Sequence, residues 1–384
     1  MIESRLPRVG TTIFTTMSAL AVQHDAVNLG QGFPDFDCDP ALVQAVDDAM
    51  RAGQNQYPPM AGWPALRHAI AHKVEALYGH AYDPDTEITV TAGATQALLT
   101  AILALVHPGD EVIVIEPAYD SYAPAITMAG ATPVYVSMNE PAGGRGHTIS
   151  WERVRAAITP RTRMLMVNSP HNPTGMTMGP DDLRQLEALA DAHGLFVLSD
   201  EVYEHMVFDG LRHESVCRYP ALASRSVVIS SFGKTFHVTG WKVGYAAAPR
   251  ALMDEFRKVH QFNVFTVNTP MQAGIAAYLA NPAPYLDLAA FYQAKRDFFA
   301  AGLDRTGFER LPVAGSYFQT VRYGRIRPGM SEIDFCRWLT TEIRVAAIPV
   351  SALYDPPNDT GLIRFCFAKK ESTLSTALER LATI

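Results

Sequence analysis

The sequence is poor in cysteine and has no hydrophobic run long enough for a membrane. Its 384 residues contain four cysteines (Cys38, Cys217, Cys336 and Cys366), and no two of them form a C-x-x-C pair. Scattered cysteines of this kind are typical of reduced thiols, so we expect a cytoplasmic protein without disulfides. The longest apolar stretch, residues 97–106, is interrupted by Thr100. It falls short of the roughly 20 residues that a transmembrane helix needs, and we expect no membrane partner.

Runs of positive charge are also missing. The 39 Asp and Glu residues outnumber the 32 Lys and Arg residues, which gives a net charge of −7 at pH 7. A nucleic-acid-binding surface needs clustered Lys and Arg to follow the phosphate backbone, so we expect no nucleic acid partner. Residues 1–5 lead into a threonine-rich segment rather than an apolar core, which argues against a signal peptide.

Common motifs of hydrolases and metalloenzymes do not occur either. The sequence has no G-x-S-x-G nucleophile elbow. His68 and His72 have the spacing of zinc ligands on a helix but lack the glutamate of an H-E-x-x-H motif. We predict no metal and interpret these histidines as part of a solvated helix face. Glu201 and Glu204 flank Tyr203, but the sequence shows no partner for an acid pair, and we assign them no role.

What the sequence does have is an alternation of strand-like and helix-like segments. Hydrophobic residues make up 48% of the chain and charged residues 18%, enough for a sizeable core. Several strands are continuous apolar runs, as in a parallel sheet covered on both faces. The pattern predicts a doubly wound α/β domain. We expect strands at 87–91, 111–115, 133–137, 164–168, 195–199 and 226–230, and helices at 95–106, 119–129, 151–158 and 181–193.

The C-terminal part changes character and predicts a smaller α+β domain. Helices are expected at 284–303, 332–341 and 372–381, and strands at 316–321 and 362–367. The first forty residues have no strong period, and we expect them to drape over a site or a partner subunit. We predict an N-terminal arm (1–35) that joins the small domain, a large ligand-binding domain (36–280) and a small C-terminal domain (281–384).

Polar residues follow several of the predicted strands where each strand ends. Thr95 follows strand 87–91, Asn172 follows 164–168, Asp200 follows 195–199 and Lys234 follows 226–230. Ligands of open α/β sheets bind at this carboxyl edge. Lys234 has small residues before it and a second cation, Lys242, eight positions later. The pKa of a lysine falls when it is desolvated or near another cation. Such an amine suits covalent attachment of pyridoxal phosphate.

Each candidate also has a simpler interpretation. Taken alone, a lysine is most often a surface residue, and Asp200 could cap a helix. Asn172-Pro173 is a common turn dipeptide. The remaining alternatives are a cation on an edge strand for Arg364, helix caps for Thr95 and Ser231, and ordinary packing for Tyr119, Phe14 and Phe265.

Seven motifs, in this order and spacing, favour the functional interpretation. Together the motifs resemble the class I aminotransferases of fold type I, and most closely the branch of methionine and kynurenine/glutamine aminotransferases. The resemblance implies a pyridoxal-phosphate-dependent transferase fold with a mostly parallel large domain and a smaller α+β C-terminal domain. The motifs are Gln31-Gly-Phe-Pro-Asp35, Thr91-Ala-Gly-Ala-Thr95, Glu116-Pro-Ala-Tyr-Asp120, Pro170-His-Asn-Pro-Thr-Gly175, Ser199-Asp-Glu-Val-Tyr203, Ser231-Phe-Gly-Lys-Thr235 and Ile363-Arg-Phe-Cys-Phe367.

The resemblance assigns the cofactor site. Lys234 would bind pyridoxal 5′-phosphate covalently and move the proton of the substrate Cα. Asp200 would face the pyridine nitrogen and keep the ring an electron sink. Tyr203 and Asn172 would bond the ring's 3′ oxygen, and Tyr119 would stack on the ring.

The resemblance also assigns the phosphate site. The phosphate would be bound by the N–H groups of Ala94 and Thr95, the Thr95 and Ser231 hydroxyls and Lys242. Many relatives have Arg at the position of Lys242. Tyr57 would reach the phosphate of a neighbouring subunit, which implies a homodimer with shared sites.

The resemblance also implies which residues would bind the substrate. Arg364 would hold the α-carboxylate through two parallel hydrogen bonds, assisted by Asn172 and the Gly32 backbone. Phe14, Tyr57 and Phe265 would lie near the side chain, and we identify no second arginine for a dicarboxylate. We therefore predict transfer of the amino group of a hydrophobic amino acid, methionine or an aromatic one, to a 2-oxo acid. The alternatives are a cysteine-S-conjugate or cystathionine β-lyase and a non-catalytic pyridoxal-binding regulator.

Overall fold

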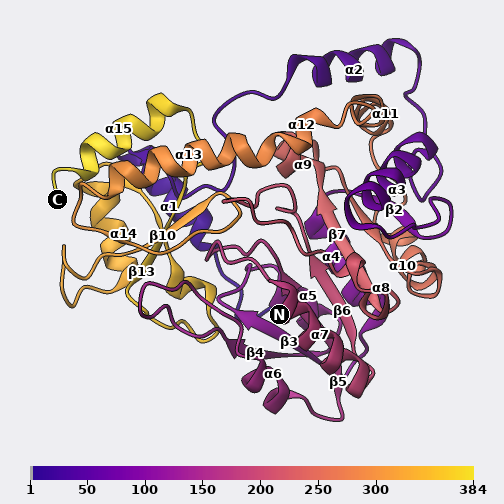
Figure 1. The fold of residues 1–384 in the computed structure, drawn as a ribbon, viewed down its shortest axis with the longest axis horizontal. Coiled ribbons are helices and arrows are strands. Elements are labelled where there is room, and N and C mark those ends of the chain that lie inside the picture. The colour runs from indigo at the N-terminus through magenta and orange to yellow at the C-terminus, as the bar shows by residue number, and fades with distance from the viewer. Residues whose placement is uncertain (1–2) are drawn as a thin grey trace.

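A seven-stranded sheet forms the centre of the larger lobe in the computed structural model, which describes residues 3–384 (Figure 1). The strand order is β2-β8-β7-β6-β5-β3-β4. Strand β8 runs antiparallel to both neighbours and the other pairings are parallel, which confirms the predicted mostly parallel sheet. The strands are β2 (Ile88–Thr91), β3 (Glu111–Glu116), β4 (Thr132–Ser137), β5 (Thr162–Asn168), β6 (Phe196–Asp200), β7 (Ser226–Ser231) and β8 (Gly244–Ala247).

Two hydrophobic cores cover the two faces of this sheet. Along β3, Ile113 belongs to one core and its neighbours Val112 and Val114 belong to the other. This alternation follows from the two-residue period of a strand. The helices of this lobe are α2 (Pro40–Arg51), α3 (Pro64–Tyr78), α4 (Ala94–Leu105), α5 (Tyr122–Met128), α6 (Trp151–Ala157), α7 (Pro180–His193), α8 (Pro220–Ala223), α9 (Phe232–Thr235), α10 (Arg250–Asn263) and α11 (Thr269–Tyr278).

A four-stranded antiparallel sheet organises the smaller lobe. Its order is β12-β13-β10-β9, and its core contains Phe335 on α14 and Phe365 on β13, both fully buried. The strands are β9 (Glu309–Arg310), β10 (Phe318–Arg322), β12 (Ile348–Pro349) and β13 (Leu362–Cys366). The helices are α12 (Ala283–Leu286), α13 (Leu288–Leu303), α14 (Glu332–Thr341) and α15 (Glu371–Leu381).

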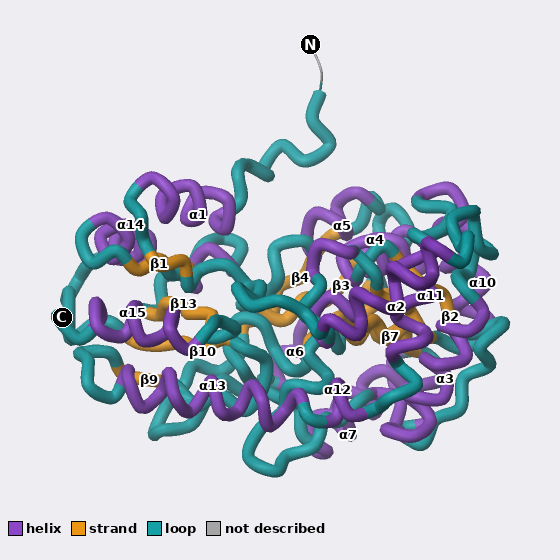
Figure 2. Tube along the Cα trace, turned by 90° about the horizontal axis from the view of Figure 1, so that it is seen from above, coloured by secondary structure: helices purple, strands orange, loops and turns teal. Residues whose placement is uncertain are grey.

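The N-terminal segment returns to this smaller lobe. Strand β1 (Val27–Asn28) pairs in parallel with β11 (Val345–Ala346), more than 300 positions later in the chain. Figure 2 shows α1 (Ile13–Gln23) and β1 beside the C-terminal elements. This pairing supports our division into an arm (1–35), a large domain (36–280) and a small domain (281–384), which remains a proposal.

Three departures from the predicted elements have local causes. Residues 13–23 form α1 although no strong period predicts it, because the Thr12 side chain accepts a hydrogen bond from Thr15 N and caps the helix. Helix α5 begins only at Tyr122, since residues 119–121 form a turn that directs their side chains to the cavity described below. The predicted helix 284–303 is divided at Asp287 into α12 and α13.

Other elements were predicted closely or not at all. Helix α7 ends at His193 as predicted, and Gly194 follows it in the left-handed conformation with φ of 65°. Residues 40–51, 250–263 and 269–278 form helices for which we predicted nothing. Helix α3 contains His68 and His72, both exposed, which confirms the predicted solvated helix face.

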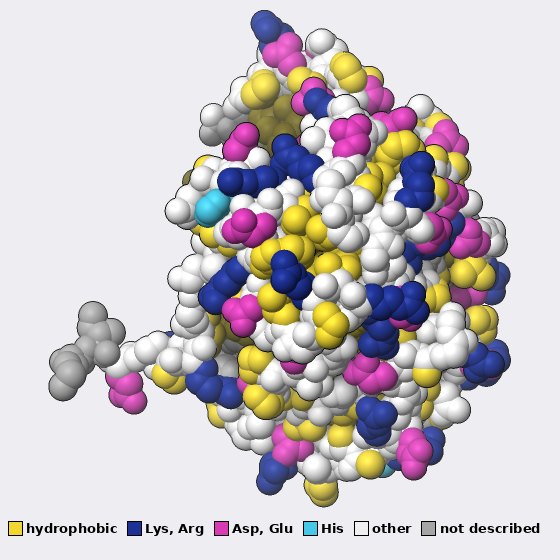
Figure 3. Space-filling model, turned by 90° about the vertical axis from the view of Figure 1, so that its left-hand side faces the viewer, with side chains coloured by type: hydrophobic (Ala, Val, Ile, Leu, Met, Phe, Trp, Pro, Cys, Tyr) yellow, Lys and Arg dark blue, Asp and Glu magenta, His cyan; other side chains and the backbone are white. Residues whose placement is uncertain are grey.

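The surface over the small lobe carries both signs of charge. Figure 3 shows Lys and Arg side chains interspersed with Asp and Glu on this face. Within residues 3–384, no helix is both long and apolar enough to cross a membrane.

Candidate active site

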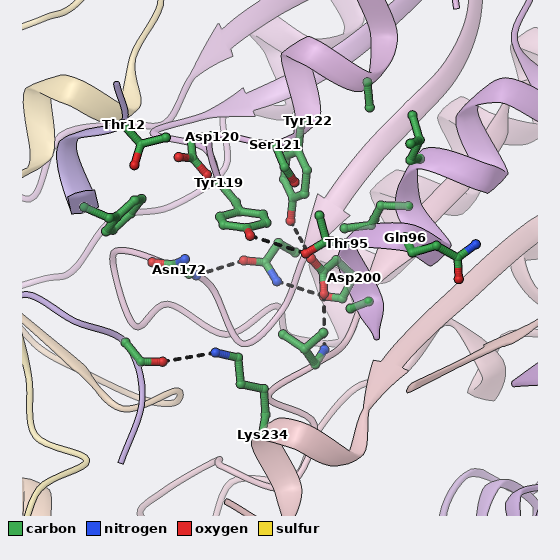
Figure 4. A pocket seen from close by; sticks show the side chains of 18 of the residues that line it. Thr12, Thr95, Gln96, Tyr119, Asp120, Ser121, Tyr122, Asn172, Asp200 and Lys234 are labelled. Carbon is green, nitrogen blue, oxygen red and sulfur yellow. Dashed lines mark hydrogen bonds between the residues drawn. The ribbon is translucent and has the colours of Figure 1, made fainter. Parts of the chain in front are cut away.

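A cavity of about 850 Å³ opens where the carboxyl edge of the large sheet meets the small lobe. Asp200 ends β6, Lys234 lies on α9 directly after β7, and Arg364 comes from β13 of the small lobe. Figure 4 shows Tyr119, Asn172, Asp200 and Lys234 around one space. The predicted residues that line the cavity are Phe14, Gly32, Ala94, Thr95, Tyr119, Asn172, Asp200, Tyr203, Lys234, Lys242 and Arg364.

The Lys234 amine is held by neutral groups only. Its Nζ donates to the Gly32 carbonyl at 3.1 Å and to the Tyr317 hydroxyl at 2.9 Å. The Tyr317 hydroxyl also donates to the Gly32 carbonyl at 2.6 Å. No carboxylate among residues 3–384 forms a salt bridge with this amine. Burial, with the nearby Arg364 and Lys242 cations, lowers the pKa of Lys234 to about 8. A neutral, nucleophilic amine is therefore accessible near neutral pH.

Asp200 is a buried carboxylate at the end of β6. Its Oδ2 accepts a hydrogen bond from the Tyr122 hydroxyl at 2.7 Å, and its Oδ1 accepts from Val202 N at 3.3 Å. Burial raises the pKa of Asp200 to about 6 despite these bonds. Within residues 3–384 no cation forms a salt bridge with it. A buried carboxylate of this kind favours a cationic partner such as a protonated ring nitrogen.

Asn172, the first residue of the Asn172-Pro173 turn, connects the two lobes. Asn172 Oδ1 accepts a hydrogen bond from Arg364 Nη1 at 2.7 Å, and Asn172 N donates to Asn168 Oδ1 at 2.8 Å. Asn168 in turn donates to the Asp200 carbonyl at 2.9 Å. One chain of hydrogen bonds therefore fixes Asn172 against both β6 and Arg364.

Arg364 is buried, and one of its hydrogen-bond donors has no partner within residues 3–384. Its Nη2 donates to the Gly30 carbonyl at 2.8 Å, and its guanidinium lies 3.9 Å from the ring centre of Phe318 and 5.2 Å from that of Phe14. Its Nε is buried and has no hydrogen-bond partner among residues 3–384. Arg364 also lines the cavity, so its guanidinium is a charged donor that a ligand carboxylate would neutralise.

The N-terminus of α4 and Lys242 concentrate positive potential at one end of the cavity. The first N–H groups of a helix have no partner within it, and α4 begins at Ala94 with Thr95 exposed beside it. A Cβ at Gly93 would lie 3.4 Å from Lys242 Nζ, so the ammonium is next to this helix end. Lys242 itself is in the left-handed region, with φ of 54°. Like charges repel here unless an anion binds, so the arrangement suits a phosphate.

Two aromatic side chains complete the cavity wall around these groups. The Tyr119 hydroxyl lies 3.4 Å from Thr95 Oγ1, and its ring meets that of Tyr122 edge to face. Tyr203 is buried, with its ring 5.8 Å from Lys234 Nζ. Both rings therefore line the same cavity as Lys234.

Three predicted residues do not line the cavity. Ser231 is buried at the end of β7. Tyr57 is 80% exposed and packs edge to face on Phe265, with 5.3 Å between ring centres. Their assigned roles remain predictions.

Three further residues of the site were missed. Tyr122 donates to Asp200, Asn168 fixes Asn172, and Tyr317 bonds Lys234. Tyr122 and Asn168 each lie two positions outside a quoted motif, which could have pointed to them. Tyr317 lies far from Lys234 in sequence, and no local pattern marks it.

The donors and acceptors fit pyridoxal phosphate. The cavity offers an unpaired amine, a buried acid, an anion-binding helix end with a cation, and aromatic walls. These are the groups that its aldehyde, ring nitrogen, phosphate and ring faces need. The residues that would hold it are Ala94, Thr95, Tyr119, Asn172, Asp200, Tyr203, Lys234 and Lys242.

Comparison with known proteins places this site in a family. Residues 24–381 match the profile of Aminotransferase class I and II. The chain is 49% identical over 380 residues to a methionine aminotransferase of Escherichia coli, covering 99% of this chain and 97% of that protein. It is 42% identical over 394 residues to a probable N-succinyldiaminopimelate aminotransferase of Mycobacterium tuberculosis, covering 100% and 98%.

A solved structure agrees with the sequence matches. The crystal structure of an Escherichia coli protein with a methionine aminotransferase function superposes with a TM-score of 0.97 at 48% identity, covering 100% of both chains.

The lowered pKa of Lys234 gives a direct test. In cofactor-free protein, the modification rate of Lys234 by trinitrobenzenesulfonate should rise with a midpoint near pH 8, since only the neutral amine attacks. Peptide mass mapping isolates this residue from the other lysines. In Asp200→Asn the midpoint should fall further, because the Asp200 charge raises the pKa of Lys234. A midpoint above pH 10 would contradict the described environment of the amine.

Proposed function

Because the chain belongs to the class I and II aminotransferases, which depend on pyridoxal 5′-phosphate, we propose that it transfers the amino group of a hydrophobic amino acid to a 2-oxo acid. Methionine is the first candidate donor and aromatic amino acids are the next. The observation that carries this proposal is the convergence of Lys234, Asp200 and Arg364 on one cavity with largely apolar walls.

The proton transfer is assigned to Lys234. Bound pyridoxal phosphate supplies an electron sink for the negative charge that develops on the substrate Cα. With a pKa of about 8, Lys234 Nζ can accept the Cα proton as a neutral amine and later release it. Its bonds to Gly32 and Tyr317 hold the amine at the cavity wall between these steps. Asp200, aided by Tyr122, would keep the ring nitrogen protonated.

Arg364 is assigned to the α-carboxylate of the substrate. Its guanidinium is fixed by Asn172 and the Gly30 carbonyl, and it lines the cavity. A planar donor fork fixes the orientation of a carboxylate, which in turn fixes the Cα–H bond. Binding energy is thereby used for orientation as well as for affinity.

The cavity walls support a hydrophobic side chain. The cations that line the cavity within residues 3–384 are Lys234, Lys242 and Arg364, and each already has a role. Besides Asp200, the acidic side chain that lines the cavity within residues 3–384 is Asp120, and a negative charge there would repel a second substrate carboxylate. Apolar residues contribute much of the wall, among them Val9, Phe14, Phe33, Leu99 and Met128. A thioether or an aromatic ring fits this surface better than a second carboxylate.

A donor screen tests the function. Purified enzyme with pyridoxal phosphate should transfer nitrogen from methionine to a panel of 2-oxo acids, with kcat/KM at least ten-fold above that for aspartate. Phenylalanine, tyrosine, kynurenine, glutamine and N-succinyldiaminopimelate complete the panel. Pyruvate and ammonia released from cysteine conjugates without any 2-oxo acid would instead support the β-lyase. Cofactor binding without either turnover would support the regulator.

Replacing Arg364 separates substrate binding from cofactor binding. Arg364→Ala should raise KM for the amino donor about 100-fold, since two charge-assisted hydrogen bonds of about 1.5 kcal/mol each are lost. The Kd for pyridoxal phosphate, measured by absorbance titration, should change less than three-fold. Arg364→Lys keeps the charge but loses the planar pair of donors, so its KM should lie between those of the wild type and Arg364→Ala. A larger effect on cofactor binding than on KM would remove Arg364 from the substrate site.

We also propose a homodimer with shared sites, in the cytoplasm. Exposed aromatic side chains cluster outside the cavity: Tyr57 is 80% exposed, Phe262 90% and Phe265 40%. Exposed apolar groups of this kind are typical of protein interfaces. In a dimer of this family, Tyr57 would reach the partner's phosphate site. The free thiols of the four cysteines support a reducing compartment.

A dimer with shared sites predicts that Tyr57 affects cofactor binding, although Tyr57 lies outside the cavity of its own subunit. Tyr57→Phe should weaken pyridoxal phosphate binding about ten-fold, the effect of one hydrogen bond to a charged group. Equilibrium dialysis measures this loss, and analytical ultracentrifugation measures the oligomeric state. Phe262→Ser is a control, because it removes an exposed ring without a proposed phosphate contact. A fully active monomer would contradict shared sites.

A further inference from the structure

Two buried carboxylates alternate with the site residues in the turn after β6. Asp200 and Tyr203 line the cavity, whereas Glu201 and Glu204 do not. Glu201 is 2% exposed and Glu204 is 4% exposed. No partner for either side chain could be identified from the sequence, but the fold supplies several.

Glu201 anchors the start of this turn. Its Oε1 accepts hydrogen bonds from Ser199 Oγ at 2.8 Å and Val216 N at 3.2 Å. Its Oε2 lies 2.7 Å from His213 Nε2. The backbone N–H of Glu201 also donates to the Ile229 carbonyl on β7 at 2.8 Å.

Glu204 has more side-chain hydrogen-bond partners than Glu201 has. Its Oε1 accepts from Lys73 Nζ at 2.6 Å and from the Tyr245 hydroxyl at 3.2 Å, and also from Ser230 Oγ. Its Oε2 accepts from the Tyr78 hydroxyl. Lys73 is 3% exposed, so the ion pair is removed from solvent.

These partners connect three segments that carry site residues. Glu204 follows Tyr203 directly, and Ser230 precedes Ser231 on β7, the strand that leads to Lys234. Tyr245 lies on β8, three positions after Lys242. Lys73 and Tyr78 come from α3 on the outside of the sheet. One carboxylate therefore fixes the relative positions of the β6 turn, the β7 end and the β8 start.

The environment favours the charged form of this carboxylate. Burial alone would raise the pKa of Glu204, but the Lys73 ammonium and the surrounding donors hold it well below its usual range. His205, buried beside the pair, is kept neutral because burial lowers its pKa to about 3. Buried ion pairs add little net stability, yet removing one partner leaves a costly unpaired charge. Such a pair is better suited to fixing geometry than to stabilising the fold.

We propose that the buried Lys73–Glu204 pair is a positioning element of the cofactor site, which acts through Tyr203, Ser231 and Lys242 rather than by touching cofactor or substrate. This inference rests on the proposed function. It adds two residues that lie outside the cavity to the determinants of cofactor affinity.

Variants of the pair test this role with holoenzyme and pyridoxal phosphate as the probe. Lys73→Met leaves the Glu204 carboxylate unpaired and should raise the Kd for pyridoxal phosphate about ten-fold, because the residues that hold the cofactor then lose their fixed positions. The pH midpoint of the visible absorbance change of the Lys234-bound cofactor should also move. The double variant Lys73→Met/Glu204→Gln removes both charges and should recover most of the affinity.

Arg67→Met is the matched control on the same helix. Arg67 is 6% exposed and bonds Gly62 and Asp85, away from the cavity. The Arg67→Met variant should have a lower melting temperature, with the Kd for pyridoxal phosphate and the pH midpoint of the absorbance change unchanged. If Lys73→Met behaves as Arg67→Met does, or if the double variant binds no better than Lys73→Met, the positioning role is overturned. Failure of the proposed function is distinguishable, because wild-type protein would then transfer no amino group from methionine or aromatic donors in the donor screen, whatever the variants do to the Kd.

Discussion

The site depends on the desolvation of one amine. Lys234 Nζ is held at the cavity wall by a carbonyl and a phenol, without a carboxylate partner. A salt bridge would keep this amine protonated and inert. Neutral acceptors and burial instead bring its pKa to about 8. The amine is therefore both a nucleophile for an aldehyde and a base for a carbon acid at physiological pH.

The fold makes this environment possible by joining distant segments at one edge. The parallel strands end beside each other, so Asp200 and Lys234 meet without any closeness in sequence. The small lobe contributes Arg364 and Tyr317, and the N-terminal segment contributes Gly32. The cations Lys234, Lys242 and Arg364 repel one another across the cavity. Binding of a phosphate and a carboxylate is favourable because these anions neutralise two of the three charges. The same arrangement would thus serve the proposed binding of both cofactor and substrate.

Much of this could be predicted from the sequence, because it rests on local pattern. The apolar strands and the polar residues after them predict the sheet and its ligand edge, and the motifs identify Lys234, Asp200 and Arg364. Contacts between distant segments could not be predicted. Tyr317 has no local signal, and the partners of Glu204 come from α3, β7 and β8. Helix α1 was missed since its cap, rather than its periodicity, defines it.

The most direct test of the central claim is to trap the bond between Lys234 and the cofactor. Purified protein loaded with pyridoxal phosphate is reduced with borohydride, digested and analysed by mass spectrometry. The account predicts a phosphopyridoxyl group on the peptide that contains Lys234, and none on that peptide in Lys234→Ala. A wild-type protein whose Lys234 peptide stays unlabelled would contradict it.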